Sequence, residues 1–564
     1  MKKLIFTCFL LWIAGMVSAQ PLTGEKNIPL DYATIQAAIV ALNANGTGTG
    51  GVIFNVDANH AETLASATAG TITATGTATN SIVFRKNPLT SGSNPKITSF
   101  VISASSATDG IIKITGGDFI TFDGIDLEEN ASNILTTRMT EWGYALVKKQ
   151  SSSPIDGCQY VTIKNCNISL NKANTASTGI YTGNHIATST SQLSPVTTSD
   201  ACNNCLFENN TISNVYVGVK LNGFSAPSPY NLYDHNNRVG QAGKNRIFNF
   251  GGLSTAAYGV FGTNQDSLQV INDSIVSGPG TTGVMAGIFF QTGNGSSAKI
   301  SGNYISVSRG TTSGSSLYGI WNQAGGTPAL NAIRIHDNVI NNCSQPVTTT
   351  GNLYGIYNTV GADTLRIYNN EIVGSTYSGT ASHFGIRSEA SGTIQFIHNN
   401  TIHQLSNTNT GGLTMIYTAT FATTNCYANH IYNCSGNGGT VYGIYSTTTP
   451  TWNVYKNNLH DISSNNGSTA ACFVYGIYNQ GGTTANIYNN FISGLGANAA
   501  TNNPAIIGID IVGGTTSNVC YNTVFLNAIS SGSTFGSAAL YAYVTPVLVL
   551  RNNILVNIST PGAS

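Results

Sequence analysis

The chain has 564 residues, of which 41% are hydrophobic and only 8% are charged, and its 23 acidic side chains balance its 23 lysines and arginines. A chain without net charge lacks the electrostatic footprint of proteins that bind nucleic acid or anionic membranes. Its apolar fraction is sufficient for a packed core, so the low charge does not indicate disorder.

The N-terminus has the pattern of a secretory signal peptide. Lys2 and Lys3 precede an apolar run over residues 4–13, and Val17-Ser18-Ala19 supplies a small-residue cleavage site. The apolar run is too short to cross a bilayer, and no later stretch approaches the ~18 apolar residues that a span requires. We therefore predict a signal peptide over residues 1–19, no membrane span, and a secreted or outer cell-surface location after its removal.

Residues 20–60 predict an N-terminal cap made of one helix and one strand. Asp31 can N-cap a short amphipathic helix, and the strand Val52–Val56 follows it. The apolar positions of this helix are Ile35, Ala38, Ile39 and Leu42. A repetitive fold needs such a cap because its first repeat would otherwise expose apolar surface and free strand edges.

From about residue 258 onward, two short phrases alternate, and each recurs every 28 to 36 residues. The first is an aromatic residue followed by Gly and Ile, as in Tyr354-Gly355-Ile356. The second is a strand, a corner and a strand, as in residues 365–372, where Asn369-Asn370 interrupts the alternation. Weaker copies precede them, so we predict that residues 61–564 form an all-β, right-handed parallel β-helix, whose last turn at Ser564 is incomplete.

Asparagine recurs at one position of the corner in successive repeats. Asn tolerates the left-handed backbone that a tight corner needs, and stacked amide side chains can hydrogen-bond from turn to turn. The predicted ladder consists of Asn303, Asn338, Asn370, Asn400, Asn429, Asn457, Asn490, Asn522 and Asn553. We interpret this ladder as structural.

Three segments near the N-terminus resemble the start of secreted pectate-lyase-like β-helix proteins. They are residues 31–38, residues 51–56 and residues 117–124, in that order. Many members of that broad group are bacterial surface proteins with a C-terminal type IX sorting domain, so the resemblance implies a secreted surface protein of this kind. The Asp-Asp pair and Gly-His-Gly of polygalacturonases and the Gly-Arg-Pro-Trp of pectin methylesterases do not occur here.

Strict alternation along the aromatic-Gly-Ile strand places Gly and the residue after Ile on one face, which we expect to be the outer one because a glycine column inside would leave voids. The outward column then reads Phe261, Phe289, Trp321, Tyr357, Arg387, Tyr417, Tyr445, Tyr478 and Asp510. A second outward column includes His336, Tyr368 and His398. Aromatic faces can stack on sugar rings, so both columns are candidate glycan-binding surfaces; the alternative is that they only stabilise adjacent strands.

Two polar clusters interrupt these columns. His383, Arg387 and Glu389 alternate along one strand and supply a base, a cation and an acid, which makes them candidate catalytic residues. Arg334 and Arg366 lie beside His336 and Tyr368 on neighbouring turns, and paired arginines can hold a carboxylated sugar. These four residues join the candidate glycan-binding set.

Nine cysteines remain after removal of the signal peptide, so at least one thiol has no intramolecular partner. Cys202 and Cys205 form the one CxxC pair, which predicts either a local disulfide or two buried thiols. A zinc site requires a second ligand pair, so we predict no metal and no cofactor.

Three functions are compatible with these patterns. The first is a non-catalytic adhesion or glycan-binding protein whose partner is an extracellular polysaccharide or a cell-surface glycan. The second is a polysaccharide lyase or glycoside hydrolase that acts on an extracellular polysaccharide, acidic polysaccharides included. The third is a purely structural spacer. The absence of a complete catalytic motif favours a protein that is not an enzyme.

Overall fold

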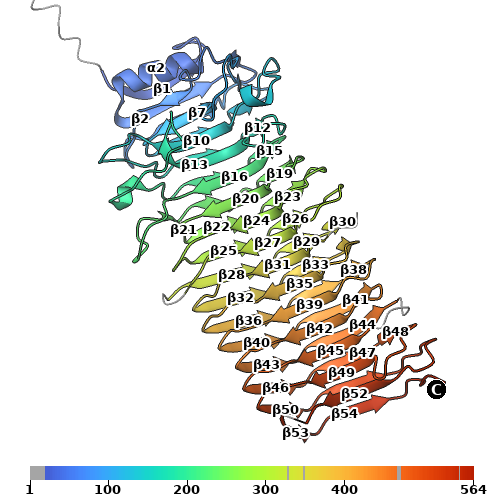
Figure 1. Cartoon of the computed structure of the whole chain (residues 1–564). Coiled ribbons are helices and arrows are strands. Elements are labelled where there is room, and N and C mark those ends of the chain that lie inside the picture. The colour runs from blue at the N-terminus through green and yellow to red at the C-terminus, as the bar shows by residue number, and fades with distance from the viewer. Residues whose placement is uncertain (1–19, 327–329, 347–349, 466–471, 545, 564) are drawn as a thin grey trace, which may run out of the picture.

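The computed structural model describes residues 20–326, 330–346, 350–465, 472–544 and 546–563, and the predicted signal peptide lies outside them. The chain is an all-β parallel solenoid of about 16 turns, which confirms the predicted fold class (Figure 1). Three long sheets run along its axis, and most turns contribute a strand to each of them. Each strand pairs in parallel with the equivalent strands of the turns before and after it.

Sheet A contains 17 strands, namely β1 (Leu22–Ile28), β2 (Thr47–Val56), β5 (Ile82–Lys86), β8 (Ile120–Asp123), β11 (Thr162–Lys164), β14 (Leu206–Glu208), β18 (Arg238–Val239), β22 (Leu268–Ile271), β25 (Ala298–Ser301), β28 (Ala332–His336), β32 (Thr364–Tyr368), β36 (Ile394–His398), β40 (Thr423–Tyr427), β43 (Thr451–Tyr455), β46 (Thr484–Tyr488), β50 (Thr516–Cys520) and β53 (Val547–Arg551). Sheet C contains 15 strands, namely β4 (Thr71–Ile72), β7 (Gly110–Thr115), β10 (Trp142–Lys148), β13 (Thr178–Ile186), β16 (Val217–Asn222), β20 (Ala257–Thr263), β24 (Met285–Phe290), β27 (Leu317–Asn322), β31 (Leu353–Asn358), β35 (His383–Ser388), β39 (Leu413–Thr418), β42 (Val441–Ser446), β45 (Val474–Asn479), β49 (Ile506–Ile511) and β52 (Ser537–Ala542).

Sheet B follows the corner after sheet A and consists of shorter strands, namely β3 (Ala61–Thr63), β6 (Lys96–Thr98), β9 (Asp126–Glu128), β12 (Asn167–Ser169), β15 (Thr211–Ser213), β19 (Arg246–Phe250), β23 (Ser274–Ser277), β26 (Tyr304–Ser306), β29 (Val339–Asn341), β30 (Ser344–Gln345), β33 (Glu371–Val373), β34 (Thr376–Tyr377), β37 (Thr401–His403), β38 (Ser406–Asn407), β41 (His430–Gly436), β44 (Asn458–Ser464), β47 (Phe491–Ser493), β48 (Leu495–Ala497), β51 (Thr523–Leu526) and β54 (Ile554–Asn557). Two further strands, β17 (Asp234–His235) and β21 (Gln265–Asp266), pair with each other. The 3-10 helices η2 (Thr136–Arg138) and η3 (Thr198–Asp200) lie in connections.

Helix α2 (Ile35–Asn45) lies over the first turn at the N-terminal end of the stack (Figure 1). Its predicted apolar face is buried, but the predicted N-cap residue is wrong. Thr34 accepts the hydrogen bond from Ala37 N–H at 3.1 Å, whereas the carboxylate of Asp31 accepts one from Asn27. The Glu62 carboxylate accepts two further bonds from the first turn of α2 and so joins the helix to sheet B.

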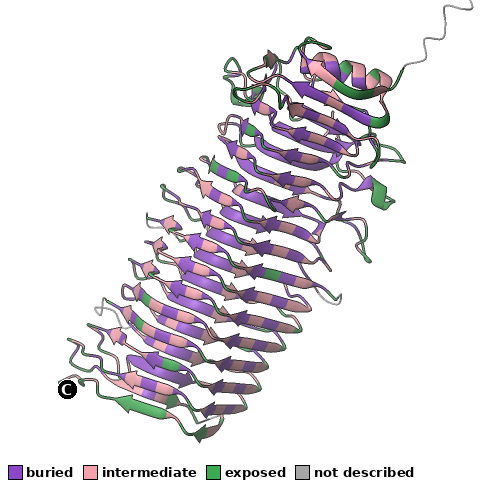
Figure 2. Ribbon diagram, turned by 180° about the vertical axis from the view of Figure 1, so that it is seen from behind, coloured by how far each residue is buried: buried purple, intermediate pink, exposed green. Residues whose placement is uncertain are grey.

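A single hydrophobic core runs through the solenoid, with buried residues alternating with more exposed ones along the strands (Figure 2). At the corner between sheets A and B, the predicted asparagine ladder is present. Asn338 Nδ2 donates to Asn370 Oδ1 at 2.9 Å and to the Ile300 carbonyl at 3.0 Å, and this pattern repeats in the neighbouring turns. The left-handed residue is the one before each ladder asparagine, such as Asn369 with φ 54°.

The ladder extends further towards the N-terminus than predicted and contains one carboxyl group. Asn245 Nδ2 donates to Asp273 Oδ1 at 2.9 Å, and the Asp273 backbone N–H donates to Asn303 Oδ1 at 2.9 Å. Asp273 Oδ2 is buried without a hydrogen-bond partner, at the place where asparagine would present its amide nitrogen. Burial raises the pKa of Asp273 to about 8, so the neutral carboxyl substitutes for an amide at neutral pH.

The aromatic-Gly-Ile strand departs from the predicted alternation. In β31, Ile356 joins the core, whereas Tyr354 and Tyr357 both belong to a separate cluster on the outer face. Gly355 faces inward, since a Cβ at this position would lie 3.0 Å from Cγ2 of the core residue Ile372, and 2.5 Å from the carbonyl oxygen of Gly385 in the next turn. The predicted outward orientation of the glycine column is therefore wrong, although the residue after Ile does lie on the outer face.

We expect Asp273→Asn to stabilise the protein increasingly as pH rises from about 4 towards 8. Because the folded-state pKa of Asp273 lies above its unfolded value, stability is full below about pH 4 and is lost as pH rises towards 8, by roughly 5 kcal/mol over this range. Thermal unfolding followed by circular dichroism should therefore show this loss for the wild type and not for Asp273→Asn. The reverse change one turn away, Asn303→Asp, should introduce a second pH-dependent loss. Parallel pH profiles for wild type and Asp273→Asn would contradict the neutral carboxyl.

Candidate functional site

Two adjoining cavities lie over the outer face of sheet C in its N-terminal turns. Their volumes are about 470 and 360 Å³, and both are lined by Ala107, Glu141, Thr175 and Ala176. We call this continuous depression the sheet C groove. Its floor comes from β10, β13 and β16, and its walls come from the connections around them.

The groove lies where the turns are longest. Phe122 pairs with Ile163 and Ile163 pairs with Phe207, which gives separations of 41 and 44 residues, and the additional residues form projecting connections (green, Figure 1). The connection after β13 is fixed at both ends. Asn184 Nδ2 donates to the Leu193 carbonyl at 2.7 Å, and the Asp200 carboxylate accepts backbone N–H bonds at 2.9 to 3.1 Å. This wall is therefore tied to the strands beneath it.

Tyr181 and His185 form a hydrogen-bonded pair in the groove. Tyr181 Oη lies 2.9 Å from His185 Nε2, and His185 Nδ1 lies 2.8 Å from the carbonyl oxygen of Ile186. A carbonyl can only accept, so Nδ1 carries the imidazole proton and Nε2 accepts the Tyr181 hydroxyl. Burial lowers the pKa of His185 and raises the pKa of Tyr181 to about 12, so both side chains are neutral at physiological pH.

Lys220 is the cation of the groove and lies next to Tyr181 in the adjacent turn. Its ammonium nitrogen lies 5.9 Å from the Tyr181 ring centroid and 5.8 Å from that of Phe261. No ion pair to Lys220 exists among the described residues, and burial lowers its pKa. Trp142 stacks on the other side of Tyr181 at 4.9 Å. The groove thus combines an unpaired amine with an aromatic wall.

Glu141 lies at the junction of the two cavities. Its carboxylate accepts hydrogen bonds from Asp109 N–H at 2.9 Å and from Asn174 Nδ2 at 3.3 Å. Burial, together with the charge of Asp109, raises the pKa of Glu141 to about 7. A carboxyl group that titrates near neutrality can donate or accept a proton at physiological pH.

Together these side chains supply an acid, a base relay and a cation around one cavity, which is a constellation suited to proton transfer on an anionic ligand. Within the described ranges, no group of three or more His, Cys, Asp or Glu side chains is placed to hold a metal ion. Among the same residues, no helix has the length and apolar character needed to cross a membrane.

The predicted catalytic trio is not assembled, because His383 belongs to the core. It pairs with Leu353 and Leu413 in the neighbouring turns and is fully buried. The prediction is wrong because Gly385 and Ile386 both face inward, so that strict alternation fails and His383 lies on the opposite face from Arg387. His383 Nδ1 donates to the Ser406 carbonyl at 3.1 Å, Nε2 is buried without a partner, and burial lowers the pKa of His383 to about 4.

Arg387 and Glu389 do meet on the outer face, where they are bonded to each other. Arg387 Nε lies 2.7 Å and Nη2 2.5 Å from Glu389 Oε2, and the Tyr357 hydroxyl donates to the other carboxylate oxygen. The Arg387 guanidinium also lies over the rings of Phe384 and Tyr417 at 4.5 and 4.9 Å. The acid and the cation therefore satisfy each other instead of facing an open site.

The aromatic residues of the predicted sheet C column stack on one another. Trp321 stacks on Phe289 at 4.1 Å and on Tyr318 at 4.3 Å, and Tyr357 stacks on Tyr354 at 4.3 Å. Further along, the rings of Tyr417, Tyr445 and Tyr478 meet edge to face at 5.0 Å. Much of the ring surface is covered by other rings, as expected if the column stabilises adjacent strands. Glycan binding by this column stays a prediction.

On sheet A, His336, Tyr368 and His398 form the predicted column as a face-to-face stack with centroids 4.6 and 5.1 Å apart. The stack continues through Tyr427, Tyr455 and Tyr488 at 4.7 to 4.8 Å. Each ring covers the next, so a sugar ring meets edges rather than faces. Arg334 and Arg366 pair directly in the neighbouring column, as predicted.

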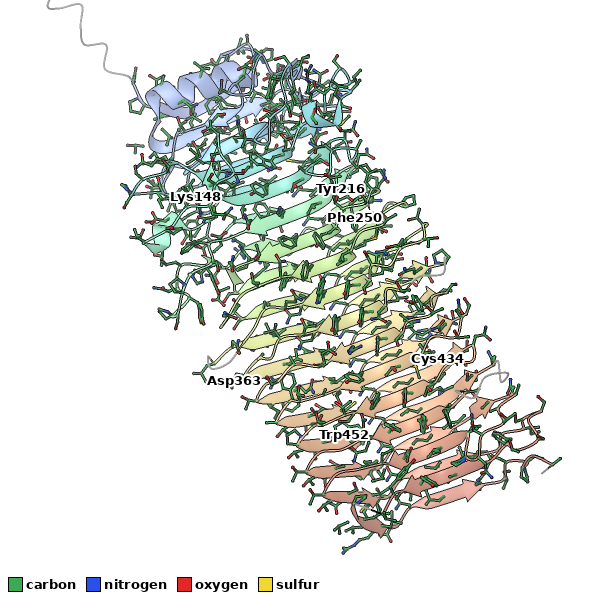
Figure 3. All side chains as sticks on the ribbon, in the orientation of Figure 1. Lys148, Tyr216, Phe250, Asp363, Cys434 and Trp452 are labelled. Atoms are coloured by element: carbon green, nitrogen blue, oxygen red, sulfur yellow. The ribbon has the colours of Figure 1, made fainter. Side chains whose placement is uncertain are left out.

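The CxxC cysteines are two buried thiols rather than a disulfide. All nine cysteines of the described residues are free, and eight are buried. Cys202 Sγ accepts a hydrogen bond from the buried ammonium of Lys148 at 3.5 Å, and Asp234 lies 4.0 Å from the same ammonium. Lys148 is labelled in Figure 3. The opposite charges of Lys148 and Asp234 therefore compensate each other inside the core.

Sequence reasoning missed every principal residue of the groove: Glu141, Trp142, Tyr181, His185 and Lys220. These residues belong to turns in which the repeat phrases are degenerate, so no column contained them. The available signal was turn length, since insertions in a solenoid gather on one face and often form its binding surface. The separations of 41 and 44 residues stand out against the later period.

The sequence matches no protein-family model and no curated protein. Among solved structures, the GH136 lacto-N-biosidase from Eubacterium ramulus is similar at 9% identity and a TM-score of 0.40, over 65% of this chain and 60% of that chain. A periplasmic alginate epimerase is similar at 10% identity and a TM-score of 0.34, over 78% and 84%. The tailspike protein of E. coli bacteriophage HK620 is similar at 12% identity and a TM-score of 0.32, over 93% and 76%.

The chain therefore spans less than two thirds of the length of the lacto-N-biosidase. At these identities and TM-scores the similarities carry no information about activity.

We expect His383→Leu to stabilise the protein, most strongly in acid. A buried imidazole with an unpaired nitrogen costs roughly 1 to 3 kcal/mol at neutral pH. Because the folded-state pKa of His383 lies below its unfolded value, stability falls further as pH drops from about 6.5 to 4, by about 3 kcal/mol. Thermal unfolding between pH 4 and 8 should show this acid loss in the wild type and its absence in the variant.

A reverse substitution provides the control. Leu413→His, at the equivalent position of the next turn, should add acid sensitivity. If His383→Leu kept the wild-type acid profile, the assignment of a neutral buried histidine would be refuted.

Proposed function

We propose that this protein is a secreted or surface-exposed enzyme that binds an extracellular acidic polysaccharide in the sheet C groove and cleaves it by β-elimination. The observation that carries the proposal is the Tyr181–His185 pair beside the unpaired Lys220 in one cavity. This is the enzyme alternative reached from the sequence, with different residues in the catalytic roles.

Lys220 prepares the substrate for proton removal. Its ammonium group has no anionic partner among the described residues and faces the same cavity as Tyr181. A uronate carboxylate bound to this ammonium is partly neutralised, which makes the adjacent C–H bond more acidic. The buried setting strengthens this interaction relative to water.

Tyr181 and His185 then move the proton. The Tyr181 oxygen takes the proton from the carbon next to the carboxylate while its own hydroxyl proton passes to His185 Nε2, 2.9 Å away. The C–H electron pair forms the new C=C bond, and the C–O bond to the neighbouring sugar breaks. Glu141, whose pKa is about 7, donates a proton to the leaving oxygen.

The carboxyl content of the groove favours elimination over hydrolysis. Most glycoside hydrolases use two carboxyl groups on opposite sides of the scissile bond. Among the residues that the structure describes, Glu141 is the one carboxyl-bearing side chain that lines either cavity of the groove. Trp142, packed against Tyr181, adds an aromatic edge that can contact a sugar.

The test uses residues 20–564 with a panel of acidic and neutral polysaccharides. We expect new unsaturated ends, measured by ultraviolet absorbance, from a uronate polymer and none from neutral polymers. Tyr181→Phe keeps the stacking on Trp142 but removes the hydroxyl, so kcat should fall about 100-fold or more. His185→Gln should act in the same direction, and Lys220→Met should raise KM as well as lower kcat.

Arg387→Ala is the matched control, because Arg387 lies on the same sheet in an ion pair outside the groove. Its cleavage rate should equal that of the wild type. Retention of a polysaccharide without product would replace the enzyme proposal by glycan binding. Neither retention nor product from any acidic polymer would overturn the proposal and leave the structural spacer.

A further inference from the structure

Four basic side chains align across successive strands on the outer face of sheet A. Arg238 pairs with Gln269, Gln269 with Lys299, Lys299 with Arg334, and Arg334 with Arg366. Parallel strands are spaced by about 4.8 Å, so these five positions extend roughly 19 Å along the solenoid axis. We call Arg238, Lys299, Arg334 and Arg366 the cationic column.

The members of the cationic column are not held in ion pairs. Among the described residues, none of its four members forms an ion pair. Arg238 donates to the Gln241 amide oxygen at 2.7 Å, and the Arg366 guanidinium lies 4.8 Å from the Phe396 ring centroid. The charge of Asp337 acts on Lys299 without an ion pair between them. Asp337, at the adjoining corner, is bound to His336 at 2.6 Å. Like charges directly opposite each other on adjacent strands are destabilising. A column of cations without ion pairs, in a chain with only 23 basic residues, therefore indicates a surface that can bind an anion.

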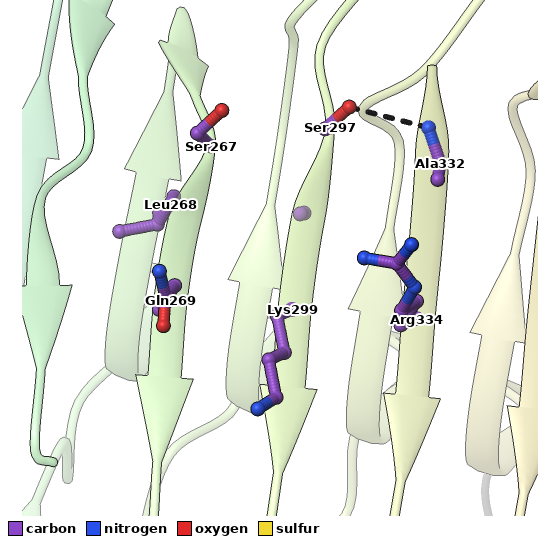
Figure 4. A pocket seen from close by; sticks show the side chains of 8 residues that line it. Ser267, Leu268, Gln269, Ser297, Lys299, Ala332 and Arg334 are labelled. Carbon is purple, nitrogen blue, oxygen red and sulfur yellow. Dashed lines mark hydrogen bonds between the residues drawn. The ribbon is translucent and has the colours of Figure 1, made fainter. Parts of the chain in front are cut away.

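A shallow cavity of about 190 Å³ marks the centre of the column. Gln269, Lys299 and Arg334 line it, together with Leu268 and the serines at the strand starts (Figure 4). Figure 4 shows Lys299 and Arg334 projecting from neighbouring strands on the same side of the sheet. The cavity has room for one anionic substituent between an ammonium and a guanidinium group.

We propose that the cationic column binds a linear acidic polysaccharide that runs along the solenoid axis and crosses the strands. Arginine binds carboxylate and sulfate groups through paired N–H donors, and the repeat of the solenoid presents such donors at regular steps. This assignment keeps the predicted sugar-binding roles of Arg334 and Arg366 and adds Arg238 and Lys299. It concerns a different sheet from the groove and does not depend on cleavage.

The neighbouring column argues for a glycan rather than a nucleic acid. Proteins that bind single-stranded nucleic acids combine a basic groove with aromatic faces on which bases stack. Beside the cationic column, the rings of His336, Tyr368 and His398 cover one another's faces at 4.6 to 5.1 Å. They present ring edges, which suit contacts with sugar hydroxyls and C–H groups but offer no platform for bases.

The binding test uses Tyr181→Phe as the background, so that the polymer is not degraded. Polygalacturonate and dextran sulfate serve as probes, with neutral dextran and a single-stranded oligonucleotide for comparison, in calorimetry at several salt concentrations. We expect salt-sensitive binding of at least one acidic polysaccharide and none of neutral dextran. Arg334→Ala and Arg366→Ala should each weaken it roughly tenfold, and the double variant should lower the salt dependence.

Arg246→Ala is the matched control, since Arg246 is an exposed arginine on sheet B. It should bind like the background protein. Unchanged affinity in the Arg334→Ala/Arg366→Ala variant would overturn the proposal, and so would oligonucleotide binding of equal strength. In the protein with Tyr181 restored, the double variant should still cleave short uronate oligomers, so loss of column binding and failure of the groove are separate results.

Discussion

The requirement that each turn fit directly against its two neighbours governs this molecule. Because a parallel solenoid has no other long-range contacts, every buried position must repeat or be compensated in the next turn. The asparagine ladder expresses this most clearly, since each amide satisfies the backbone of one turn and the side chain of the next. Asp273 occupies a ladder position only because burial keeps its carboxyl group neutral. The same constraint places glycine at position 355, where the next turn leaves no space for a Cβ.

The periodic part of the fold could be predicted from the sequence because stacked turns require similar residues at equivalent positions. Isoleucine and asparagine recur at fixed intervals, and their interior positions were assigned correctly. The assignment of strand faces failed at the Gly-Ile pair, where two consecutive residues point inward and strict alternation no longer applies. His383 illustrates the cost of that error. In the sequence it resembles a catalytic base next to Arg387, whereas in the fold it replaces a leucine of the core column.

The groove could not be predicted by the same reasoning, because it exists where the repeat is broken. Tyr181 and His185 are four residues apart on one strand, but their meeting with Lys220 and Glu141 depends on the registration of three turns. The connection carrying Thr190 and Gln192 lines the cavity, and nothing in its composition specifies that position. The unusual length of these turns was visible, whereas the chemistry they enclose required the structure.

In-register stacking also explains why the most regular aromatic surfaces are poor candidates for catalysis. When Tyr368 is followed by another ring in the next turn, each ring covers the face of the other, and neither face is free for a ligand.

The sheet C column behaves differently at its N-terminal end, where Ala145 lies between Lys113 and Tyr181. Because Ala145 is small, Tyr181 has no aromatic neighbour in its own column in the preceding turn. Its neighbour in the following turn is Lys220. In a solenoid, side chains are therefore available for function where the residue type of a column changes from one turn to the next. A change in size has this effect, and so does a run of like charges. On sheet A, three successive positions of a column are cations, Lys299, Arg334 and Arg366, which repel instead of satisfying one another.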